Sequence, residues 1–291
     1  MATSSCRMVL SVVLLSGLAA AASAANADPG FTVTPIAGSV TLLHGYDGNM
    51  LVSAGDDGIV LVDTCVAEVA DQLLAAVKRI SGKPIRFVVN THVHGDHSGG
   101  NAAFQKLAPV IAHHNVRTRM TTGEEKFPAE ALPIVTFDDE VTLHLNGENI
   151  RLLKVPAGHT DTDVVVFFEK AHVVHMGDVF MSPAASFVDV SNGGTILGLI
   201  EALEFVLPQI PADAKIVPGH GTVSSRADVA RGLEVLKGMK AVVESAIREG
   251  KTLQQLIEEK PFEKWESSKV PGVPMHVYVR QFYRELTAKR E

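Results

Sequence analysis

One stretch of the 291-residue chain decides the fold: Asn90-Thr91-His92-Val93-His94-Gly95-Asp96-His97-Ser98-Gly99-Gly100-Asn101. It places three imidazoles and one carboxylate between His92 and His97. The apolar run Ile85–Val89 precedes it and is typical of a buried strand. The glycines allow the sharp turn that leads from a strand into a helix. Because imidazole nitrogen and carboxylate oxygen are ligands of zinc and similar divalent ions, the stretch predicts a metal-binding loop.

The composition is that of an ordinary globular protein, with 46% hydrophobic and 20% charged residues. The length suffices for one large domain or two small ones with a sizeable core. The formal net charge of −7 disfavours a nucleic-acid groove or an anionic membrane surface as the partner. We therefore expect a small-molecule substrate. The sequence does not indicate an oligomeric state.

The N-terminus has the pattern of a cleaved secretory signal peptide. Arg7 supplies a positive charge, and an apolar run extends from Met8 to Ala22. Small-x-small sites then predict cleavage after Ala24 or Ala27. We assign 1–24 as the signal peptide and 25–291 as one domain with a helical C-terminal tail, which predicts a periplasmic or secreted protein. The alternative is a membrane anchor, for which the run is short.

Strand and helix patterns alternate along the mature chain. Strands are expected at 31–43, 50–54, 59–63, 85–89, 110–112, 135–137, 141–145, 150–155, 164–168, 172–176 and 215–217. Helices are expected at 67–80, from Ser98 or Asn101 to 107, and at 115–121, 197–207 and 225–249; the tail 252–291 is also helical, with Trp265 and Tyr283 as packing anchors. Strands precede helices in 31–121 and again in 135–249. Two such halves predict an αββα sandwich of two mixed β-sheets flanked by helices, in the α/β class.

Three later residues repeat the pattern of the opening stretch. His159, Asp178 and His220 each follow an apolar strand, and a glycine stands immediately before each of them. Glycine lets the chain turn tightly and approach a shared ion. Asp63 also ends a strand, and we expect it to accept the N–H of a ligand imidazole.

The remaining histidines and Cys65 lack this context. Surface or supporting positions are expected for His44, His144, His172, His175 and His276, while His113 and His114 follow a short strand and are weak candidates for metal contact. Cys65 ends an apolar strand, which indicates a buried, inert thiol rather than a metal ligand.

The pattern His92-x-His94-x-Asp96-His97, followed by His159, Asp178 and His220, resembles the metallo-β-lactamase superfamily. The match extends over about residues 31–225 in order and spacing, and Asp57-Gly58-x-x-Leu61-Val62-Asp63-Thr64 resembles an early strand of that family. The resemblance implies an αββα sandwich with a dinuclear metal site at one edge.

The resemblance also implies a role for each residue. One metal would be held by His92, His94 and His159, the second by Asp96, His97 and His220, with Asp178 bridging the two. His-rich ligation favours two zinc ions, and iron or manganese also suits these ligands. Asp96 would orient the metal-bound hydroxide as well as bind metal, which makes it the catalytic candidate.

The chain departs from the antibiotic-degrading members at Asp178, where members that resemble it carry Cys or Ser. A bridging Asp is the pattern of the thioesterase, lactonase and phosphoesterase branches. The expected function is a dinuclear hydrolase of an ester, thioester, lactone or amide. The open alternatives are a β-lactamase, a mononuclear-iron sulfur dioxygenase and a non-catalytic metal-binding protein. We expect the loop Ser182–Thr195 to line the pocket, with a helix N-terminus available to a substrate carboxylate or simply capped.

Overall fold

The computed structural model describes residues 30–123, 126–182 and 186–288. The expected signal peptide, its cleavage sites and the alternative membrane anchor lie outside these ranges and stay predictions. Within the described ranges, no helix has the length and apolar character needed to cross a membrane.

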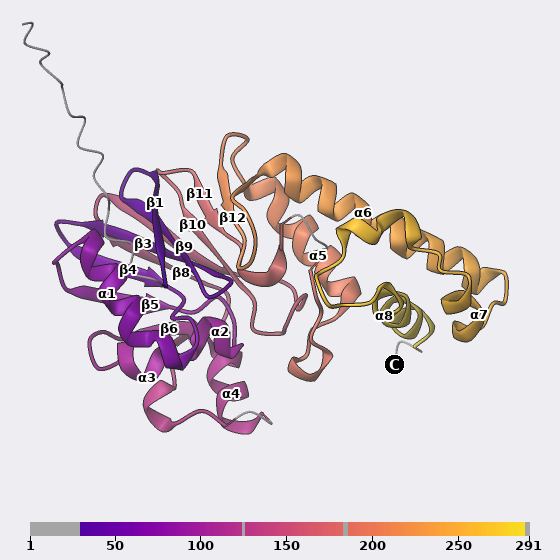
Figure 1. The fold of residues 1–291 in the computed structure, drawn as a ribbon, viewed down its shortest axis with the longest axis horizontal. Coiled ribbons are helices and arrows are strands. Elements are labelled where there is room, and N and C mark those ends of the chain that lie inside the picture. Colours follow the sequence, from indigo (N-terminus) through magenta and orange to yellow (C-terminus); the bar gives the residue numbers. More distant parts are fainter. Residues whose placement is uncertain (1–29, 124–125, 183–185, 289–291) are drawn as a thin grey trace, which may run out of the picture.

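Two mixed β-sheets form the centre of the molecule (Figure 1). The first contains, in spatial order, β1 (Thr32–Ala37), β2 (Val40–Gly45), β3 (Gly48–Gly55), β4 (Gly58–Val62), β5 (Ile85–Val89), β6 (Val110–His113) and β7 (Val135–Phe137). Its neighbours are antiparallel from β1 to β4 and parallel from β4 to β7.

The second sheet contains, in spatial order, β13 (Ser224–Ser225), β12 (Lys215–Val217), β11 (Val173–His175), β10 (Val164–Phe168), β9 (Glu148–Lys154) and β8 (Glu140–Leu145). Only the β11–β12 pair is parallel among these neighbours. Because β12 returns parallel to β11, the chain between them must cross over, and a helix fills that crossover.

The central strands pack on both faces, because successive side chains of a strand point to opposite sides of the sheet. In β4, Val60 and Val62 point between the sheets, whereas Ile59 and Leu61 point to the outer helices. In β10, Val164, Val166 and Phe168 lie in the core between the sheets, whereas Val165 and Phe167 lie in the outer core of the second sheet. Burial on both faces explains why these strands are continuous apolar runs.

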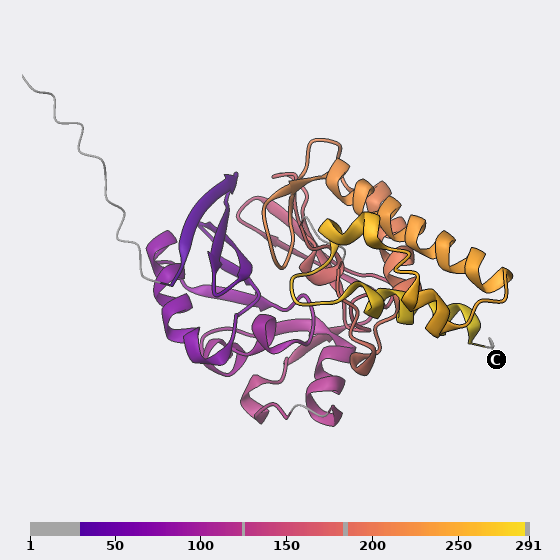
Figure 2. The same cartoon turned by 45° about the vertical axis from the view of Figure 1, so that its right-hand side comes forward.

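Helices cover the outer face of each sheet (Figures 1 and 2). The first half contains α1 (Ala70–Ile80), α2 (Gly95–Ser98), α3 (Asn101–Phe104) and α4 (His114–Thr122). The second half contains α5 (Ile196–Val206), α6 (Arg226–Arg248), α7 (Leu253–Glu258) and α8 (Met275–Thr287). Leu73 and Val77 of α1 pack on the first sheet, and Leu199 of α5 and Leu236 of α6 pack on the second. The predicted αββα sandwich is therefore confirmed.

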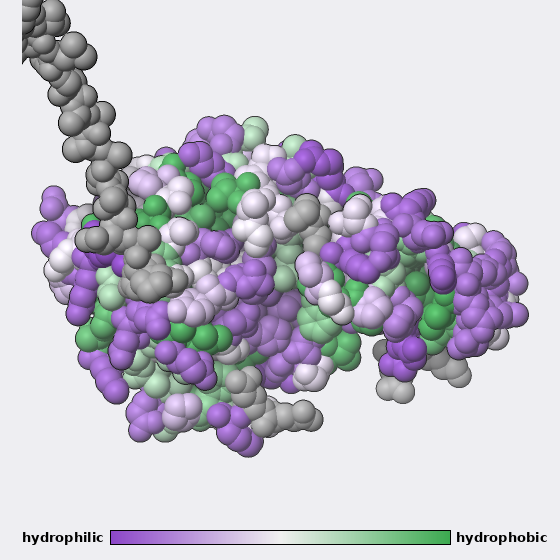
Figure 3. Space-filling view, viewed as in Figure 1, coloured by the Kyte–Doolittle hydropathy of each residue, from purple (hydrophilic) through white to green (hydrophobic). Residues whose placement is uncertain are grey.

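The C-terminal tail is helical and packs against the second half. Trp265 and Tyr283 are partly buried against the outer core of the second sheet, as expected of packing anchors. Hydrophilic side chains dominate the outer surface of this helical end in the view of Figure 3. Ser225 begins α6 through a capping box with Asp228, which satisfies backbone N–H groups that the helix itself leaves unpaired.

Two sequence-based element assignments were wrong. Residues 31–43 form two strands rather than one, because Gly38 adopts a left-handed φ of +54° and turns the chain between β1 and β2. The helix expected to reach residue 107 is two short helices, α2 and α3. Neither expected cap works as one: the Ser98 hydroxyl donates to the carbonyl of Val93 at 2.8 Å, and the buried Asn101 amide bonds Asn90. Both polar side chains hold the preceding loop instead of starting a helix.

Candidate metal centre

All seven predicted donors lie just past the ends of strands, with Asp96 and His97 in the short helix α2 and Asp178 in a 3-10 turn. The segment from His92 to His97 follows β5 of the first sheet, whereas His159, Asp178 and His220 follow β9, β11 and β12 of the second. Among the described residues, two groups have donor atoms within 4.8 Å of one another: His92, His94, His159 and Asp178 form one, and Asp96, His97 and His220 form the other. The site therefore joins the edges of both sheets.

The first group is spaced as the corners of a coordination shell. His94 Nδ1 lies 3.1 Å from His92 Nε2 and 2.9 Å from His159 Nε2. Asp178 Oδ2 lies 3.9 Å from His92 Nε2 and 3.6 Å from His159 Nε2. Metal–nitrogen bonds of about 2.0–2.1 Å in tetrahedral geometry separate neighbouring donors by about 3.3 Å, so one ion fits among these atoms.

The second group has the same spacing. His220 Nε2 lies 3.3 Å from His97 Nε2 and 3.1 Å from Asp96 Oδ2, and His97 Nε2 lies 3.5 Å from Asp96 Oδ2. Asp178 reaches this group as well, with Oδ1 3.5 Å from His97 Nε2 and Oδ2 3.4 Å from His220 Nε2. Asp178 therefore stands between both groups, as a bridging carboxylate must.

A buried oxygen supports the fit of a cation. Asp178 is 5% exposed, and its Oδ1 has no hydrogen-bond partner among the described residues. An unpaired buried carboxylate oxygen is costly, and a bound ion would remove that cost. The carboxylate has the position and the vacant lone pairs that metal binding requires.

Each histidine uses its other ring nitrogen to bond an acceptor. His97 Nδ1 lies 2.8 Å from Asp63 Oδ2, and His94 Nε2 lies 2.8 Å from Asp189 Oδ2. The remaining pairs are His92 Nδ1 with Thr91 Oγ1 at 3.1 Å, His159 Nδ1 with the Phe187 carbonyl at 2.7 Å, and His220 Nδ1 with the Asp47 carbonyl at 2.6 Å. An acceptor at one nitrogen places the proton there and leaves the lone pair of the other nitrogen facing the centre.

The electrostatics of the ligand cluster also fit cation binding. Burial would lower the pKa of His97, but the carboxylates of Asp178 and Asp63 raise it to about 9. Burial would likewise lower the pKa of His220, but hydrogen bonds to Asp178 and Asp96 raise it to about 11. Burial would raise the pKa of Asp96, whereas the hydrogen bond with His220 and the charge of His97 lower it to about 2. Cations at this site would replace protons that the carboxylates otherwise hold there.

Glycines make the close approach possible. A Cβ on Gly219 would lie 2.0 Å from Asp178 Oδ1 and 2.9 Å from His97 Cε1. Gly177 has a left-handed φ of +49°, and a Cβ there would lie 2.9 Å from the Thr91 side chain. Gly177 and Gly219, which precede Asp178 and His220, are therefore required by the packing of the site.

Exposure marks the open side of the centre. His92, His97 and His159 are almost fully buried, whereas the side chains of His94 and His220 are 23% and 19% exposed. Of the two carboxylates among the seven donors, Asp96 is the more accessible, with 39% of its side chain exposed. A substrate would therefore approach over Asp96, His94 and His220.

The other candidates stay out of the two groups. His113 is buried and His114 is exposed, and neither belongs to a metal-capable group among the described residues. His44, His144, His172 and His276 are exposed, whereas His175 is fully buried and bonds the backbone of Asn49 and Gly177. Cys65 is buried, as expected, and its burial raises the pKa of the thiol. Asp63 accepts the ligand N–H as predicted.

The N-terminus of α5, one possible site for a substrate carboxylate, already binds a carboxylate of the chain itself. Glu285 of α8 accepts the N–H groups of Ile196 and Leu197, at 2.8 and 3.0 Å, and the Thr195 hydroxyl caps the same helix. Of the two alternatives left open for this helix, the structure favours the capped one, because a carboxylate from α8 satisfies the N–H groups and the positive end of the helix dipole.

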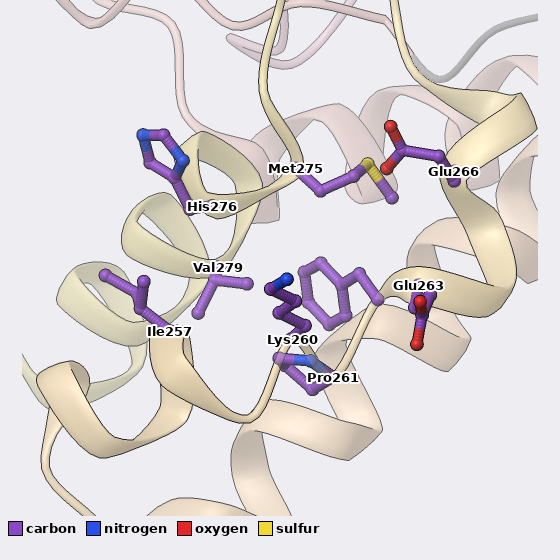
Figure 4. Close-up of a pocket in the computed structure, with 9 residues that line it drawn as sticks. Ile257, Lys260, Pro261, Glu263, Glu266, Met275, His276 and Val279 are labelled. Carbon is purple, nitrogen blue, oxygen red and sulfur yellow. The ribbon is translucent and has the colours of Figure 1, made fainter.

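Two cavities of about 520 Å³ each lie in the described structure. One borders His94 and is lined mainly by polar groups from the metal loop, α4 and the segment 189–192. The expected contribution of the loop Ser182–Thr195 to the pocket is thus confirmed for Asp189, Ser191 and Asn192. The other cavity lies between α7 and α8, around Met275 and Val279, and contains none of the seven donors (Figure 4).

Sequence reasoning did not identify Asp189 and Arg119. Asp189 accepts from His94, and Arg119 of α4 lines the cavity beside it. The clustered donors after β5 signal four of the candidates, and a strand followed by a glycine and a donor signals the other three, but neither Asp189 nor Arg119 has either context. Their roles depend on contacts that no local pattern reveals.

A sandwich of two mixed sheets, with clustered His and Asp donors at the joined sheet edges, defines a class of metal-dependent proteins. A sequence profile of the metallo-β-lactamase superfamily matches residues 45–238. The chain belongs to this superfamily.

Characterised relatives point to hydrolysis. A hydroxyacylglutathione hydrolase of Nitrosococcus oceani is 32% identical over 152 residues, which span 51% of this chain and 53% of that protein. A metallo-β-lactamase type 2 of Bacteroides fragilis is 22% identical over 201 residues, 68% of this chain and 76% of that protein. The match thus spans about half the length of the first relative.

Solved structures show the same fold. A metallo-β-lactamase from Pontibacter korlensis superimposes with a TM-score of 0.63 at 22% identity, covering 71% of this chain and 99% of that one. The DIM-1 metallo-β-lactamase gives a TM-score of 0.63 at 19% identity, covering 72% and 98%.

Proposed function

We propose that the protein is a dinuclear, zinc-dependent hydrolase of a small molecule with an ester, thioester, lactone or amide carbonyl. One observation carries the proposal: Asp178 stands between two groups of histidine and aspartate donors, with oxygens 3.4–3.9 Å from ligand nitrogens of both groups. Membership of a superfamily with hydrolase relatives supports it. The donor set has no thiolate among the described residues, so iron or manganese would also be accepted.

The chain's own residues determine what such a site can do. Two divalent ions held here would supply a hydroxide at neutral pH and polarise a carbonyl oxygen. Asp96 is the accessible carboxylate, so it accepts a hydrogen bond from the attacking oxygen and orients it. His92, His97 and His159 form the buried floor, which excludes water from the side away from the substrate.

The relatives suggest two substrate classes to compare. The Nitrosococcus oceani relative is a hydroxyacylglutathione hydrolase, which makes a thioester the first candidate. The Bacteroides fragilis relative is a metallo-β-lactamase, which makes a β-lactam the second. A bridging Asp178 in place of the Cys or Ser of similar lactamases favours the first.

Metal analysis combined with a substrate panel tests the proposal. We expect two ions per chain and turnover of an aryl ester, thioester or lactone, with a loss of about 100-fold or more in His94→Ala because a missing ligand removes the metal chemistry. The exposed His172→Ala is the matched control and should keep full activity. Faster turnover of a chromogenic cephalosporin would select the β-lactamase. One iron per chain with oxygen uptake would identify a sulfur dioxygenase. Metal binding without any turnover would identify a non-catalytic metal-binding protein.

We also propose that the protein is exported. Arg7, the apolar run 8–22 and the two small-x-small sites support this location. Fractionation of expressing cells, with mass determination of the mature N-terminus, should place the protein in the periplasm or medium, cut after Ala24 or Ala27. Full-length protein in the membrane fraction would contradict it.

A further inference from the structure

The cavity beside the metal centre has the dimensions of a substrate pocket. Its volume of about 520 Å³ lies within the range of about 300–1,000 Å³ typical of small-molecule sites. Val93 and His94 of the metal loop form one wall, Arg119 and Phe127 a second, and Asp189 with Asn192 a third; these are six of its lining residues. A molecule whose carbonyl reaches the metal ligands would extend the rest of its length into this space.

Arg119 is the permanent cation of the cavity lining that the structure describes. Asp161 holds one edge of its guanidinium, with Nε–Oδ1 at 3.1 Å and Nη2–Oδ2 at 2.5 Å. Nη1 donates to the Ser191 carbonyl at 3.3 Å. Since guanidinium has five N–H groups, these contacts leave one N–H on each terminal nitrogen for another acceptor. The side chain is 28% exposed, so an incoming group can reach it.

The neighbouring carboxylates of Asp161 and Asp189 leave Arg119 able to bind a further anion. Asp161 pairs with Arg119 itself and fixes the guanidinium in place, which reduces the entropy lost when a ligand binds. Asp189 is compensated by donors, because its oxygens accept from His94, from the Ser191 backbone and hydroxyl, and from the Asn192 amide. The other anion site in this region, the N-terminus of α5, already holds Glu285.

We propose that Arg119 anchors a carboxylate of the substrate while the carbonyl to be hydrolysed lies against the metal ligands. The substrate class is therefore a carboxylate-bearing ester, thioester or lactone. This inference rests on the proposed hydrolase function and specifies what the same site selects. A guanidinium donates more strongly to an ionised carboxylate than to a neutral acceptor, so the N–H groups left on its terminal nitrogens favour a carboxylate over a carboxamide.

Matched substrate pairs test the anchor. One pair is 3-carboxyphenyl acetate and 3-carbamoylphenyl acetate, and the other is the 4-nitrophenyl monoester of adipic acid and that of adipamic acid. Each pair differs only in a carboxylate or a carboxamide, once on the alcohol side and once on the acyl side. We expect the metal-loaded wild type to prefer the carboxylate member of at least one pair. In Arg119→Gln, kcat/KM for that member should fall about 10- to 100-fold, mainly through KM, while the carboxamide member changes less than about threefold.

Two further variants separate anchoring from a structural role. Arg117→Gln lies on the same helix, where Arg117 donates to the Pro133 carbonyl at 2.7 Å, and it should keep the wild-type preference. Asp161→Asn keeps the Arg119 charge but weakens the contact that fixes the guanidinium, so the carboxylate preference should decrease less than in Arg119→Gln. Equal losses for both members of each pair in Arg119→Gln would overturn the anchor and indicate a structural role. A wild type without any carboxylate preference would also overturn it, whereas no hydrolysis of any member would instead contradict the proposed function.

Discussion

At the scale of single residues, the centre depends on acceptors behind the histidines as much as on the histidines. Asp189 accepts from His94, a donor of the first group, whereas Asp63 accepts from His97, a donor of the second. Both carboxylates orient an imidazole and increase its basicity as a ligand. Asp63 also accepts from the Thr91 hydroxyl, which in turn contacts His92, so its direct partner lies in the second group and its indirect one in the first. Asp189 and Asp63 are thus different direct supports of the two halves of the centre.

These two direct contacts predict that substitution of each carboxylate weakens mainly one of the two metal sites. Asp189→Asn should weaken the first metal site about 10- to 100-fold, and Asp63→Asn should do the same to the second, because the neutral amide holds the imidazole less strongly. Cobalt titration with a competing chelator should show one tight and one weakened site in each variant, with the visible spectrum identifying which site fills first.

An exposed pair provides the control for these titrations. His172 Nδ1 lies 2.9 Å from Asp213, the same kind of contact without a role in the centre. Asp213→Asn should leave both metal affinities unchanged. Identical titrations for Asp189→Asn and Asp63→Asn would contradict separate supports.

At the scale of elements, the C-terminal helix α8 is joined to the half of the molecule that supplies three of the donors. Glu285 accepts two backbone N–H groups at the start of α5, and α5 packs on the second sheet. Gln281 of the same helix donates to the Val188 carbonyl at 3.0 Å, beside Asp189. The tail therefore supports the segment that borders the cavity and holds His94.

Removal of the Glu285 charge should destabilise the protein. We expect Glu285→Gln to lower the free energy of unfolding by about 1 kcal/mol and Glu285→Ala by about 2 kcal/mol, because charged hydrogen bonds at a helix N-terminus are lost. Denaturant unfolding of the metal-free protein measures this. The exposed Glu201→Gln on α5 is the control, and an unchanged midpoint for Glu285→Ala would contradict the role of the contact.

At the scale of the whole molecule, the centre joins the two sheets. The first sheet supplies the donors from His92 to His97, and the second supplies His159, Asp178 and His220. Any ion bound among them cross-links the two halves of the sandwich. Metal binding and the stability of the whole fold are therefore coupled.

Metal removal should lower the thermal stability of the protein. At ion concentrations a thousand times the dissociation constant, each site adds about 4 kcal/mol, which corresponds to a shift of roughly 10 °C for a chain of this size. Differential scanning calorimetry before and after chelation, followed by zinc addition, measures the shift and its recovery. His220→Ala should show a smaller shift, and equal melting temperatures with and without metal would contradict the coupling.

The sequence by itself determined the sandwich and the set of candidate donors, because both follow from local patterns. Continuous apolar runs such as those of β4 and β10 specify strands that are buried on both faces, and a glycine before a donor at a strand end marks each later candidate. Local rules did not predict the hydrogen bonds of Ser98 and Asn101, because each side chain can bond either a helix N-terminus or the neighbouring loop. Tertiary packing directed both side chains to the loop instead of to a helix start.

Only the tertiary structure decided how the centre is supported and what its cavity selects. The contacts of Asp189 with His94, Arg119 with Asp161, and Glu285 with Ile196 join residues 95, 42 and 89 positions apart. Such pairs have no periodic or local signature, because they form between side chains that come together after the sheets and helices have packed. The chemistry of the ligands is readable in the chain, whereas their orientation and the charge of the cavity depend on the fold.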